Sequence, residues 1–275
     1  MTDDYRDINR ANWDERAAAH AASPEYAFHR FEADPKFLSD VVRFDLPRLG
    51  SISGLRGVHL QCHIGTDTVS LARLGARMSG LDFSPAALVE ARRLAAIARA
   101  DVDFHEADVY AAVEVFGHGV FDLVFTGIGA LCWLPDIRRW ADVVVALLRP
   151  GGTLFLREGH PMLFALADVG SDGRLVVEDP YFERAEPVVR EYGGTYVETP
   201  ATFSRNLTHV WNHGLGEIVT ALLDRGMELT TLVEHDSAPW EAVPGHMEQI
   251  DLGEWRLRDR PIRLPLTYTL KAVKR

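Results

Sequence analysis

The sequence is poor in the features of secreted, disulfide-stabilised and membrane-spanning proteins. It has only two cysteines, Cys62 and Cys132, which do not make a disulfide framework. No stretch approaches the ~18 consecutive apolar residues of a membrane-spanning helix. The first ten residues, MTDDYRDINR, lack the basic and then apolar pattern of a signal peptide. We therefore expect a cytoplasmic protein that does not enter the membrane.

Positive charge is also scarce, and it is not clustered. The formal net charge is −11, from 29 lysines and arginines against 40 aspartates and glutamates. A nucleic-acid surface depends on clustered cations that displace counterions, so a polynucleotide substrate is disfavoured. A chain of 275 residues, 47% hydrophobic and 25% charged, is typical of one soluble α/β domain with or without a cap. Its expected partner is a small molecule, and the chain is expected to be a monomer or a homodimer.

One stretch, residues 58–84, organises the rest of the chain. An apolar strand leads through a loop into a helix from about Thr68, and a second strand, Met78 to Leu81, ends on Asp82. Strand, loop, helix, strand and terminal acid form the mononucleotide-binding half of a doubly wound sheet. Asp82 follows the loop glycine, Gly65, by about 17 positions, close to the ~20 of a carboxylate that binds both hydroxyls of a ribose.

The loop in this stretch lacks the glycines that a dinucleotide site requires. A G-x-G-x-x-G fingerprint needs three, for the turn, for the approach of the pyrophosphate and for helix packing, and only Gly65 is present. A pyrophosphate would therefore meet the side chains of Gln61 and His63. The loop favours an adenosine that carries something other than phosphate.

At these residues the sequence resembles the class I S-adenosylmethionine-dependent methyltransferases. It is similar to a bacterial small-molecule branch that carries LQCHxGxDTxSLARLGA in place of LDxGCGxG, and residues 60–76 match that motif closely. The resemblance covers nearly the whole chain and is weakest from about residue 163 to 205. Further matching segments follow in order: GLDFS at 80–84, ADV at 107–109, LCWLP at 131–135, LRPGG at 148–152, residues 213–217 and residues 264–272.

The resemblance implies S-adenosylmethionine as the cofactor and S-adenosylhomocysteine as the product. It implies that the Asp108 carboxylate receives the adenine amino group and that the Val109 backbone N–H lies on the ring. Asp82 and Asp108 end successive strands, where ligands of such sheets collect. The expected cofactor-binding residues are Gln61, Cys62, His63, Gly65, Asp67, Thr68, Asp82, Phe83, Ser84, Asp108, Val109, Thr126, Gly127, Trp13 and Tyr26.

The amino-acid end of the cofactor must be held in an altered way. The resemblance implies an acid near the end of the first strand that often contacts the methionine amino group, and His59 replaces it here. Gln61, Asp67 or an N-terminal residue would then take this part. The resemblance also implies that N-terminal aromatic residues close over the cofactor; a plain helical layer over the sheet edge is the alternative.

The remaining pattern predicts an α/β fold with a doubly wound, mostly parallel seven-stranded sheet whose last strand is antiparallel. Residues 1–56 are expected to form an N-terminal helical lid segment. Residues 57–162 and 206–275 are expected to form the Rossmann-like methyltransferase core. Residues 163–205, where periodicity fades, are expected to form an inserted substrate cap of hairpin character. Residues 237–259 are interpreted as a loop.

The expected acceptor is a small molecule. The loop after the fourth strand lacks the Asn/Asp-Pro-Pro-Tyr-like sequence expected of DNA and protein amide methylases. Trp133 could present its π-face to a sulfonium, although a lone tryptophan is more often a core residue. Aromatic residues of the inserted segments could line the acceptor pocket, and strand propensity explains some of them equally well. The expected substrate-binding residues are Trp133, Tyr181, Tyr192 and Trp240.

A histidine is the expected general base. An oxygen or protonated nitrogen acceptor must lose a proton, and histidine is the side chain best tuned for this near neutral pH. His213, in a Trp-Asn-His segment, is the first candidate, and His160, just after the fifth strand, is the second. A surface or helix-capping role is the alternative for each.

No metal site is expected. His209, His213 and Glu217 are spaced four apart, as ligands on one helix face would be, but Gly214 and Gly216 interrupt that helix. The sequence thus predicts a methyltransferase that acts on an oxygen or nitrogen of a small molecule by in-line displacement. A non-catalytic S-adenosylmethionine-binding protein and, less favoured, a nicotinamide-dependent oxidoreductase are the alternatives.

Overall fold

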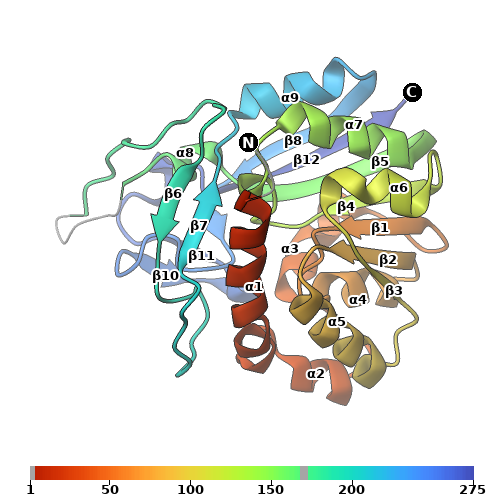
Figure 1. The fold of residues 1–275 in the computed structure, drawn as a ribbon, viewed down its shortest axis with the longest axis horizontal. Helices are drawn as coiled ribbons and strands as arrows, with labels where there is room; N and C mark the ends of the chain where they lie inside the picture. The colour runs from red at the N-terminus through yellow and green to blue at the C-terminus, as the bar shows by residue number, and fades with distance from the viewer. Residues whose placement is uncertain (1–3, 168–172) are drawn as a thin grey trace.

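The computed structural model describes residues 4–167 and 173–275, and its centre is a seven-stranded sheet (Figure 1). The strand order is β3-β2-β1-β4-β5-β12-β8. β12 runs antiparallel to β5 and β8, whereas the pairs among β3, β2, β1, β4 and β5 are parallel. The predicted sheet is thereby confirmed. Its strands are β1 (Arg56–Leu60), β2 (Arg77–Asp82), β3 (Asp103–Glu106), β4 (Phe121–Thr126), β5 (Leu148–Gly159), β8 (Met227–His235) and β12 (Thr267–Lys274).

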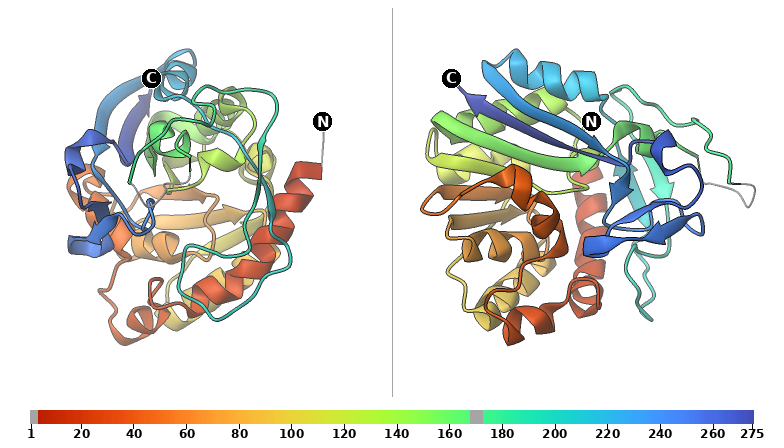
Figure 2. Two further views of the ribbon diagram at one scale, coloured as in Figure 1. Left: turned by 90° about the vertical axis from the view of Figure 1, so that its left-hand side faces the viewer. Right: turned by 180° about the vertical axis from the view of Figure 1, so that it is seen from behind.

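Helices cover both faces of this sheet (Figure 1 and Figure 2). α3, α4 and α5 lie on one face, and α6, α7 and α9 lie on the other. No helix in the two described ranges is long and apolar enough to cross a membrane. The helices are α1 (Asp4–Ala22), α2 (Phe28–Ala33), α3 (Asp40–Leu49), α4 (Thr66–Arg73), α5 (Pro85–Ala98), α6 (Ala112–Phe116), α7 (Ile137–Leu147), α8 (Pro161–Phe164) and α9 (Leu215–Leu223).

The start of α5 follows directly from its sequence. Ser84 is the N-cap residue, and its hydroxyl accepts a hydrogen bond from the Ala87 backbone N–H at 3.0 Å. Pro85 occupies the first helical position, where its missing N–H costs nothing and its fixed φ suits the helix. Only Phe83 separates this N-cap residue from the last residue of β2, Asp82. The end of β2 and the start of α5 therefore lie at the same edge of the sheet.

The core lies on both faces of the sheet: Val124 of β4 belongs to the cluster that includes α7, and Leu123 and Phe125 belong to the cluster that includes α3. Val58 and Leu60 of β1 and Val124 of β4 are fully buried, as expected for parallel strands covered by helices on both sides. Trp140 of α7 is also fully buried and belongs to the same cluster. The carboxyl ends of β1, β2, β3 and β4 are therefore held by a rigid support.

A β-hairpin lies outside this core. β6 (Val188–Glu191) pairs with β7 (Leu207–Val210) in antiparallel register. The hairpin extends past residue 205, where the sequence suggested that the insertion ends. The run from Gly194 to Glu198, within the segment expected to have hairpin character, forms no strand. α1 packs between this hairpin and α5, so the N-terminal helix joins the insertion to the core (Figure 1).

A second small sheet corrects the interpretation of residues 237–259 as a loop. β9 (Ser237–Ala238), β10 (Met247–Gln249) and β11 (Trp255–Leu257) form a three-stranded antiparallel sheet in the order β10-β11-β9. It lies in the connection between β8 and β12 and packs on its own apolar cluster with Leu163 and Leu266. These strands have two or three residues each, too few to show a period of two in the sequence.

Candidate functional site

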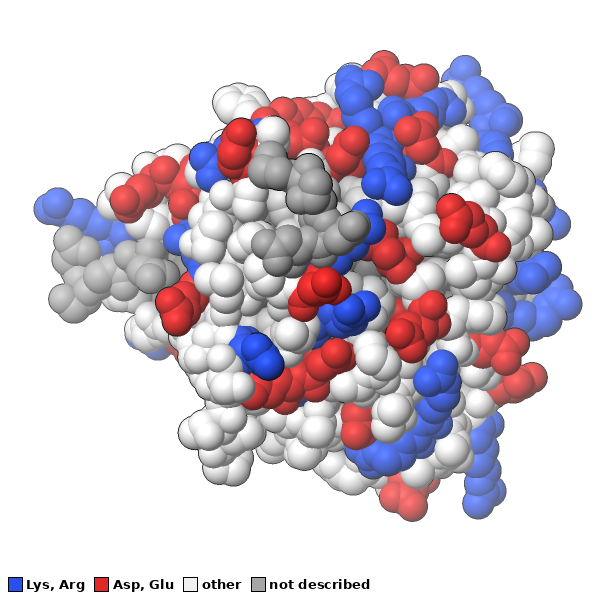
Figure 3. Space-filling model, in the orientation of Figure 1, with Lys and Arg blue, Asp and Glu red and all other residues white. Residues whose placement is uncertain are grey.

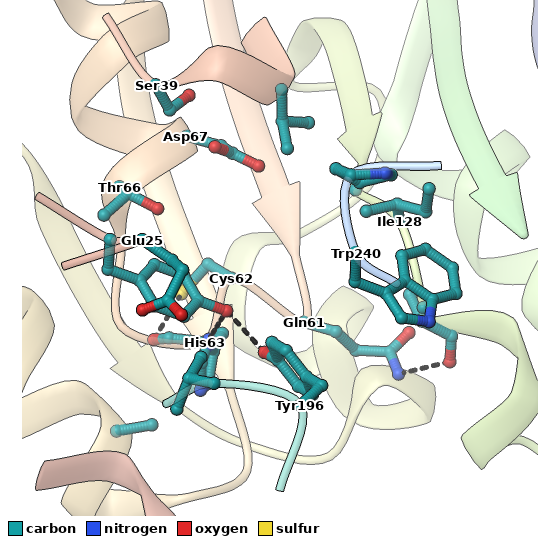
Figure 4. Close-up of a pocket in the computed structure, with 18 of the residues that line it drawn as sticks. Glu25, Ser39, Gln61, Cys62, His63, Thr66, Asp67, Ile128, Tyr196 and Trp240 are labelled. Carbon is teal, nitrogen blue, oxygen red and sulfur yellow. Dashed lines mark hydrogen bonds between the residues drawn. The ribbon is translucent and has the colours of Figure 1, made fainter. Parts of the chain in front are cut away.

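A cavity of about 1100 Å³ lies beyond the carboxyl ends of the parallel strands. The loops after β1, β2, β3 and β4 line it, together with α1, the start of α3, and the segment from β9 to β11. This is the edge at which ligands of open α/β sheets bind. Figure 4 shows part of its lining, with Gln61 between the His63 loop and the pair Ile128 and Trp240.

The loop after β1 keeps a glycine-like backbone without glycines. Gln61 and His63 have φ values of 55° and 51°, in the left-handed region that glycine prefers, and Gly65 has a φ of 82°. Such a conformation costs a non-glycine residue roughly 1–2 kcal/mol. Gln61 is held by a hydrogen bond from its Nε2 to the Ala130 carbonyl at 2.9 Å. Its Oε1 is buried and has no hydrogen-bond partner among the described residues.

Asp82 lies at the tip of β2 and is fixed by two backbone N–H groups. His63 N donates to Oδ2 at 2.8 Å and Ser84 N donates to Oδ1 at 2.9 Å. Burial raises the pKa of Asp82 to about 6, and these two hydrogen bonds act in the opposite direction. Each oxygen retains a lone pair, and Asp82, Phe83 and Ser84 all line the cavity.

Asp108 follows β3 and lines the same cavity. Its Oδ1 accepts a hydrogen bond from Tyr110 N at 2.8 Å, and its Oδ2 lies 3.1 Å from Arg6 Nε on α1. Val109 is buried beside it and also lines the cavity. The two acids expected at the ends of successive strands are therefore found at one site.

His59, Asp67 and Gly127 form a second corner of the cavity. His59 is buried, and its Nδ1 lies 2.9 Å from Thr68 Oγ1. Burial lowers the pKa of His59 to about 3, so its ring is neutral near pH 7. Burial also raises the pKa of Asp67, whereas the Ser39 hydroxyl and the more distant Arg157 lower it. Thr68 and Thr126 are buried behind this corner and do not line the cavity. Gly65, in the loop after β1, does not line the cavity either.

Aromatic rings and imidazoles cover the loop after β1. Trp13 of α1 makes edge-to-face contacts with His63 and Trp133, at ring centroid distances of 5.1 and 5.3 Å. Tyr26 O–H lies 3.3 Å from His63 Nδ1 and hydrogen-bonds to Tyr196. All of these residues line the cavity. Trp13 and Tyr26 thus lie where a lid over the loop would be.

The far side of the cavity, which we call the outer wall, is mostly apolar. Trp133 lies near its inner limit, with Nε1 donating to the Gly129 carbonyl at 2.8 Å. Tyr181 and Tyr192, expected from the sequence at the acceptor site, do not line the cavity: the Tyr181 hydroxyl accepts from Leu215 N, and the Tyr192 side chain is exposed. The outer wall consists of Val41, Ile128, Phe164, Pro239, Trp240, Leu252 and Trp255.

The two histidines expected as bases are buried outside the cavity lining. His213 Nε2 lies 2.8 Å from the Leu134 carbonyl, and its Nδ1 lies 2.6 Å from Glu183 Oε2. His160 caps α8, accepting from Met162 N at 3.0 Å, and its Nε2 lies 3.0 Å from Glu234. Both rings hold neighbouring segments in place, and the structure does not bring either to the cavity.

Glu158 is a structural residue of the site that the sequence did not indicate. Its carboxylate is buried and accepts four backbone N–H groups, from Gly129, Ala130, Leu131 and Gly159, at 2.5 to 2.8 Å. It therefore shapes the loop after β4. The only sequence signal is an acid at the end of a buried strand, and a buried acid requires such donors.

No group of three or more histidine, cysteine, aspartate or glutamate side chains in the described part of the chain is arranged to hold a metal ion. His209 lies on β7, whereas Glu217 lies in the first turn of α9, where its carboxylate accepts from Gly214 N at 2.6 Å. The His209, His213 and Glu217 spacing therefore does not correspond to one helix face.

Comparisons with known proteins agree with this arrangement. Residues 58–154 match the model of a methyltransferase domain family. A ubiquinone biosynthesis O-methyltransferase from Xanthomonas campestris is 33% identical over 126 residues, covering 44% of this chain and 51% of that protein. One from Xanthomonas oryzae is 34% identical over 125 residues, with the same coverage. The chain thus spans about half the length of the curated relatives it matches.

Solved structures share the fold of nearly the whole chain. An S-adenosylmethionine-dependent methyltransferase from Mesorhizobium loti matches with a TM-score of 0.59 at 21% identity, over 89% of this chain and 100% of that one. A geranyl diphosphate C-methyltransferase from Streptomyces coelicolor matches with a TM-score of 0.54 at 14% identity, over 85% and 78% of the two chains. The match at residues 58–154 identifies a methyltransferase domain in this chain, and the sheet order and overall fold are similar to those of S-adenosylmethionine-dependent methyltransferases.

Proposed function

We propose that this protein transfers a methyl group from S-adenosylmethionine to a nitrogen or oxygen atom of a small molecule. The observation that carries the proposal is the single cavity in which Asp82, Asp108, the loop after β1 and the outer wall meet. Its volume of about 1100 Å³ lies at or above the ~300–1,000 Å³ typical of small-molecule pockets, so a cofactor and a second molecule can lie side by side.

The residues present fit the cofactor. Asp82 has the position and free lone pairs to accept the ribose hydroxyls, and Asp108 with Val109 lies where the adenine would be. Gln61 lines the cavity beside them, and its side chain is fixed by the hydrogen bond to the Ala130 carbonyl. Gln61 and His63 adopt left-handed backbone conformations that glycine would adopt without strain. Such backbone strain is typical of ligand-binding loops.

The chain's own residues position the reactants and exclude water. The bound cofactor supplies an activated methyl group, so positioning of the acceptor accounts for much of the catalysis. Trp13 and Tyr26 cover the loop from the N-terminal side, and the outer wall offers apolar contacts to the acceptor. Burial keeps the rings of His59 and His63 neutral near pH 7, because it lowers the pKa of each. Neither ring adds a positive charge to a cationic cofactor.

Calorimetric titration with S-adenosylmethionine, S-adenosylhomocysteine and NADH tests this function, repeated on Asp82→Ala. We expect both sulfur nucleosides to bind and the substitution to weaken them at least tenfold, with thermal unfolding showing that the variant is folded. Acceptor pools incubated with the wild type should gain one methyl mass. Binding without transfer to any acceptor would favour a non-catalytic binding protein, and binding of NADH alone would reject the proposal.

A further inference from the structure

Gly127 leaves open the corner of the cavity between His59 and Asp67. A Cβ atom on residue 127 would lie 3.1 Å from His59 Nε2 and 3.6 Å from Asp67 Oδ2. Both polar atoms therefore lie close to the backbone of Gly127, and all three residues line the cavity. A side chain at position 127 would crowd His59, so the glycine keeps this corner accessible. Figure 4 shows Asp67 beside Ser39, at the start of α4.

The charge in this corner is unbalanced. No ion pair involves Asp67 in the described part of the chain, and the Ser39 hydroxyl is its side-chain hydrogen-bond donor. The nearest influential cation, Arg157, already binds both oxygens of Glu254 at 3.0 and 2.9 Å. His59 is neutral near pH 7. A half-buried carboxylate without a counter-ion is unfavourable, so a bound cation would stabilise this corner.

The order of the strands indicates which cation reaches this corner. Asp82 ends β2 and Asp108 follows β3, whereas Gly127 follows β4, and β1 lies between β2 and β4. A nucleoside bound through Asp82 and Asp108 therefore extends its substituent across the loop after β1 towards Gly127. The substituent of S-adenosylmethionine carries an ammonium group at its far end and a sulfonium nearer the ribose.

We propose that Asp67, rather than a residue of β1, binds the α-ammonium group of the cofactor, in the corner of the cavity beside the Gly127 backbone. The inference rests on the proposed function, because it requires this cofactor. It assigns to α4 the negative charge that the end of β1 lacks. His59 then contributes a neutral polar neighbour, held through Thr68.

Three ligands separate the possible roles of Asp67. S-adenosylmethionine carries ammonium and sulfonium, S-adenosylhomocysteine carries only the ammonium, and 5′-methylthioadenosine carries neither. We expect Asp67→Asn to weaken the first two at least tenfold in calorimetry and to change 5′-methylthioadenosine less than twofold. Loss of S-adenosylmethionine alone would assign Asp67 to the sulfonium, and equal loss of all three would make it a positioning residue of the loop. Either result overturns the proposal.

A change in the ligand provides a second test, and its first measurement uses the wild-type protein alone. An S-adenosylhomocysteine analogue with hydrogen in place of the α-amino group should bind the wild type at least tenfold more weakly than the parent. Asp67→Asn should bind parent and analogue about equally, which is the coupling expected of a direct contact. If the wild type binds the two equally, the proposal is wrong. If the wild type binds none of these nucleosides, the proposed function itself fails.

Asp40→Asn is the matched control. Asp40 also lines the cavity, but its Oδ1 pairs with Arg43 at 2.7 Å and its Oδ2 lies beside Gly253. Asp40→Asn should leave the affinities for S-adenosylmethionine, S-adenosylhomocysteine and 5′-methylthioadenosine within twofold of the wild-type values. A loss equal to that of Asp67→Asn would show a general effect of cavity charge and overturn the proposal. The unliganded Asp67→Asn protein should melt no lower than the wild type, because an uncompensated charge has been removed.

Discussion

At the residue scale, Gln61 and His63 show how a cofactor loop can change its side chains and keep its path. Their left-handed conformations are strained, and each side chain makes contacts that a glycine could not. Gln61 holds the Ala130 carbonyl, and His63 contacts Tyr26 and His20. The substituted side chains thus fasten the loop to the residues that surround the cavity.

Glu158 is the residue whose exchange we expect to disturb the site most without touching a ligand. In Glu158→Gln, one oxygen becomes an NH₂ group that faces two backbone N–H donors, so two buried hydrogen bonds are lost. The free energy of unfolding should fall by roughly 1–3 kcal/mol, measured by urea denaturation. Glu234→Gln, at a half-exposed carboxylate paired with His160, should change it by less than about 0.5 kcal/mol. Equal effects would contradict the role of Glu158.

His20 makes stability depend on pH. Burial, and then Arg16, lower its pKa from 6.5 to about 4. Between these values the unfolded chain binds more protons than the folded one, so the free energy of unfolding falls as pH drops from 6.5 towards 4. His20→Gln should make this slope shallower by up to about 1.4 kcal/mol per pH unit. Urea unfolding between pH 4.5 and 7.5 measures it.

The matched exchange for that experiment is His118→Gln, at an exposed position. A slope that changes as much in His118→Gln as in His20→Gln would contradict the assignment to the buried ring. Glutamine at position 20 can still hydrogen-bond to Thr195, which His20 Nε2 approaches at 2.6 Å. A general loss of stability in His20→Gln, without a change of slope, would contradict it as well.

The sequence predicted the positions of some site residues and not of others. Asp82 and Asp108 could be placed because each follows a recognisable strand, and the ends of parallel strands meet at one edge. Glu158 could not, because its partners are backbone N–H groups of a loop with no signature of their own. The environment of His213 was hidden as well: its partners, Leu134 and Glu183, lie far from it in the chain.

At the element scale, two separate segments cover the cavity. The β6–β7 hairpin and its flanks are tied to α1 by side chains that bind backbone carbonyls. Arg16 is buried and donates to the carbonyls of Gly194, Tyr192 and Arg205, and Asn12 also donates to the last of these. This cover lies over the loop after β1, whereas the β9–β11 sheet carries most of the outer wall.

The sequence pointed to residues 163–205 as the substrate cap because periodicity fades there. In the structure, both this segment and residues 239–255 contribute to the cavity lining. From this segment Phe164, Tyr196, Val197 and Glu198 line the cavity, whereas the outer wall is supplied mainly by residues 239–255. Strands of two or three residues leave no periodic pattern, and contacts between segments about 190 residues apart are not encoded locally. The shortness of its strands explains why the β9–β11 sheet could not be predicted, and the sequence separation explains the same for the contacts between α1 and the flank of the β6–β7 hairpin.

We therefore expect acceptor recognition to depend on the β9–β11 sheet. Trp240→Ala should raise the KM for the acceptor roughly tenfold, equivalent to about 1.4 kcal/mol of binding, because an indole face of the outer wall is lost. Its affinity for S-adenosylhomocysteine should stay within twofold. Steady-state kinetics and calorimetry measure the two effects.

Tyr192→Ala provides the comparison, since that ring is 66% exposed and lies outside the cavity lining. It should leave the acceptor KM unchanged. If Tyr192→Ala raises the KM as much as Trp240→Ala, or if Trp240→Ala weakens the nucleoside instead, the acceptor does not bind at the outer wall.

At the scale of the whole molecule, acidic charge extends into the cavity. On the face drawn in Figure 3, acidic and basic side chains are interspersed. Asp40 and Glu241, which line the cavity, are next in sequence to the outer-wall residues Val41 and Trp240, whereas the lining arginines Arg6 and Arg30 belong to α1 and α2. Asp40 is paired with Arg43, whereas Glu241 accepts a hydrogen bond from the Gly245 N–H. We therefore expect the acceptor to bind in a negative field.

A negative field favours some nucleophiles over others. A neutral amine gains positive charge as the methyl group arrives, and nearby carboxylates stabilise that change. A carboxylate or phenolate acceptor carries negative charge before the transfer, so the same residues destabilise it. Although the curated relatives named above are ubiquinone biosynthesis O-methyltransferases, we expect this protein to prefer an amine with a flat apolar body.

Acceptors that share one aromatic body test this preference. We expect aniline, which is neutral near pH 7, to be methylated with a kcat/KM at least tenfold above that of phenol or benzoate, measured by mass spectrometry of the products. Glu241→Gln should reduce the ratio severalfold, because it removes the unpaired charge beside the outer wall, whereas Glu186→Gln, at an exposed position outside the cavity lining, should not. Equal or faster transfer to the carboxylate would show that the field of Asp40 and Glu241 does not select the acceptor.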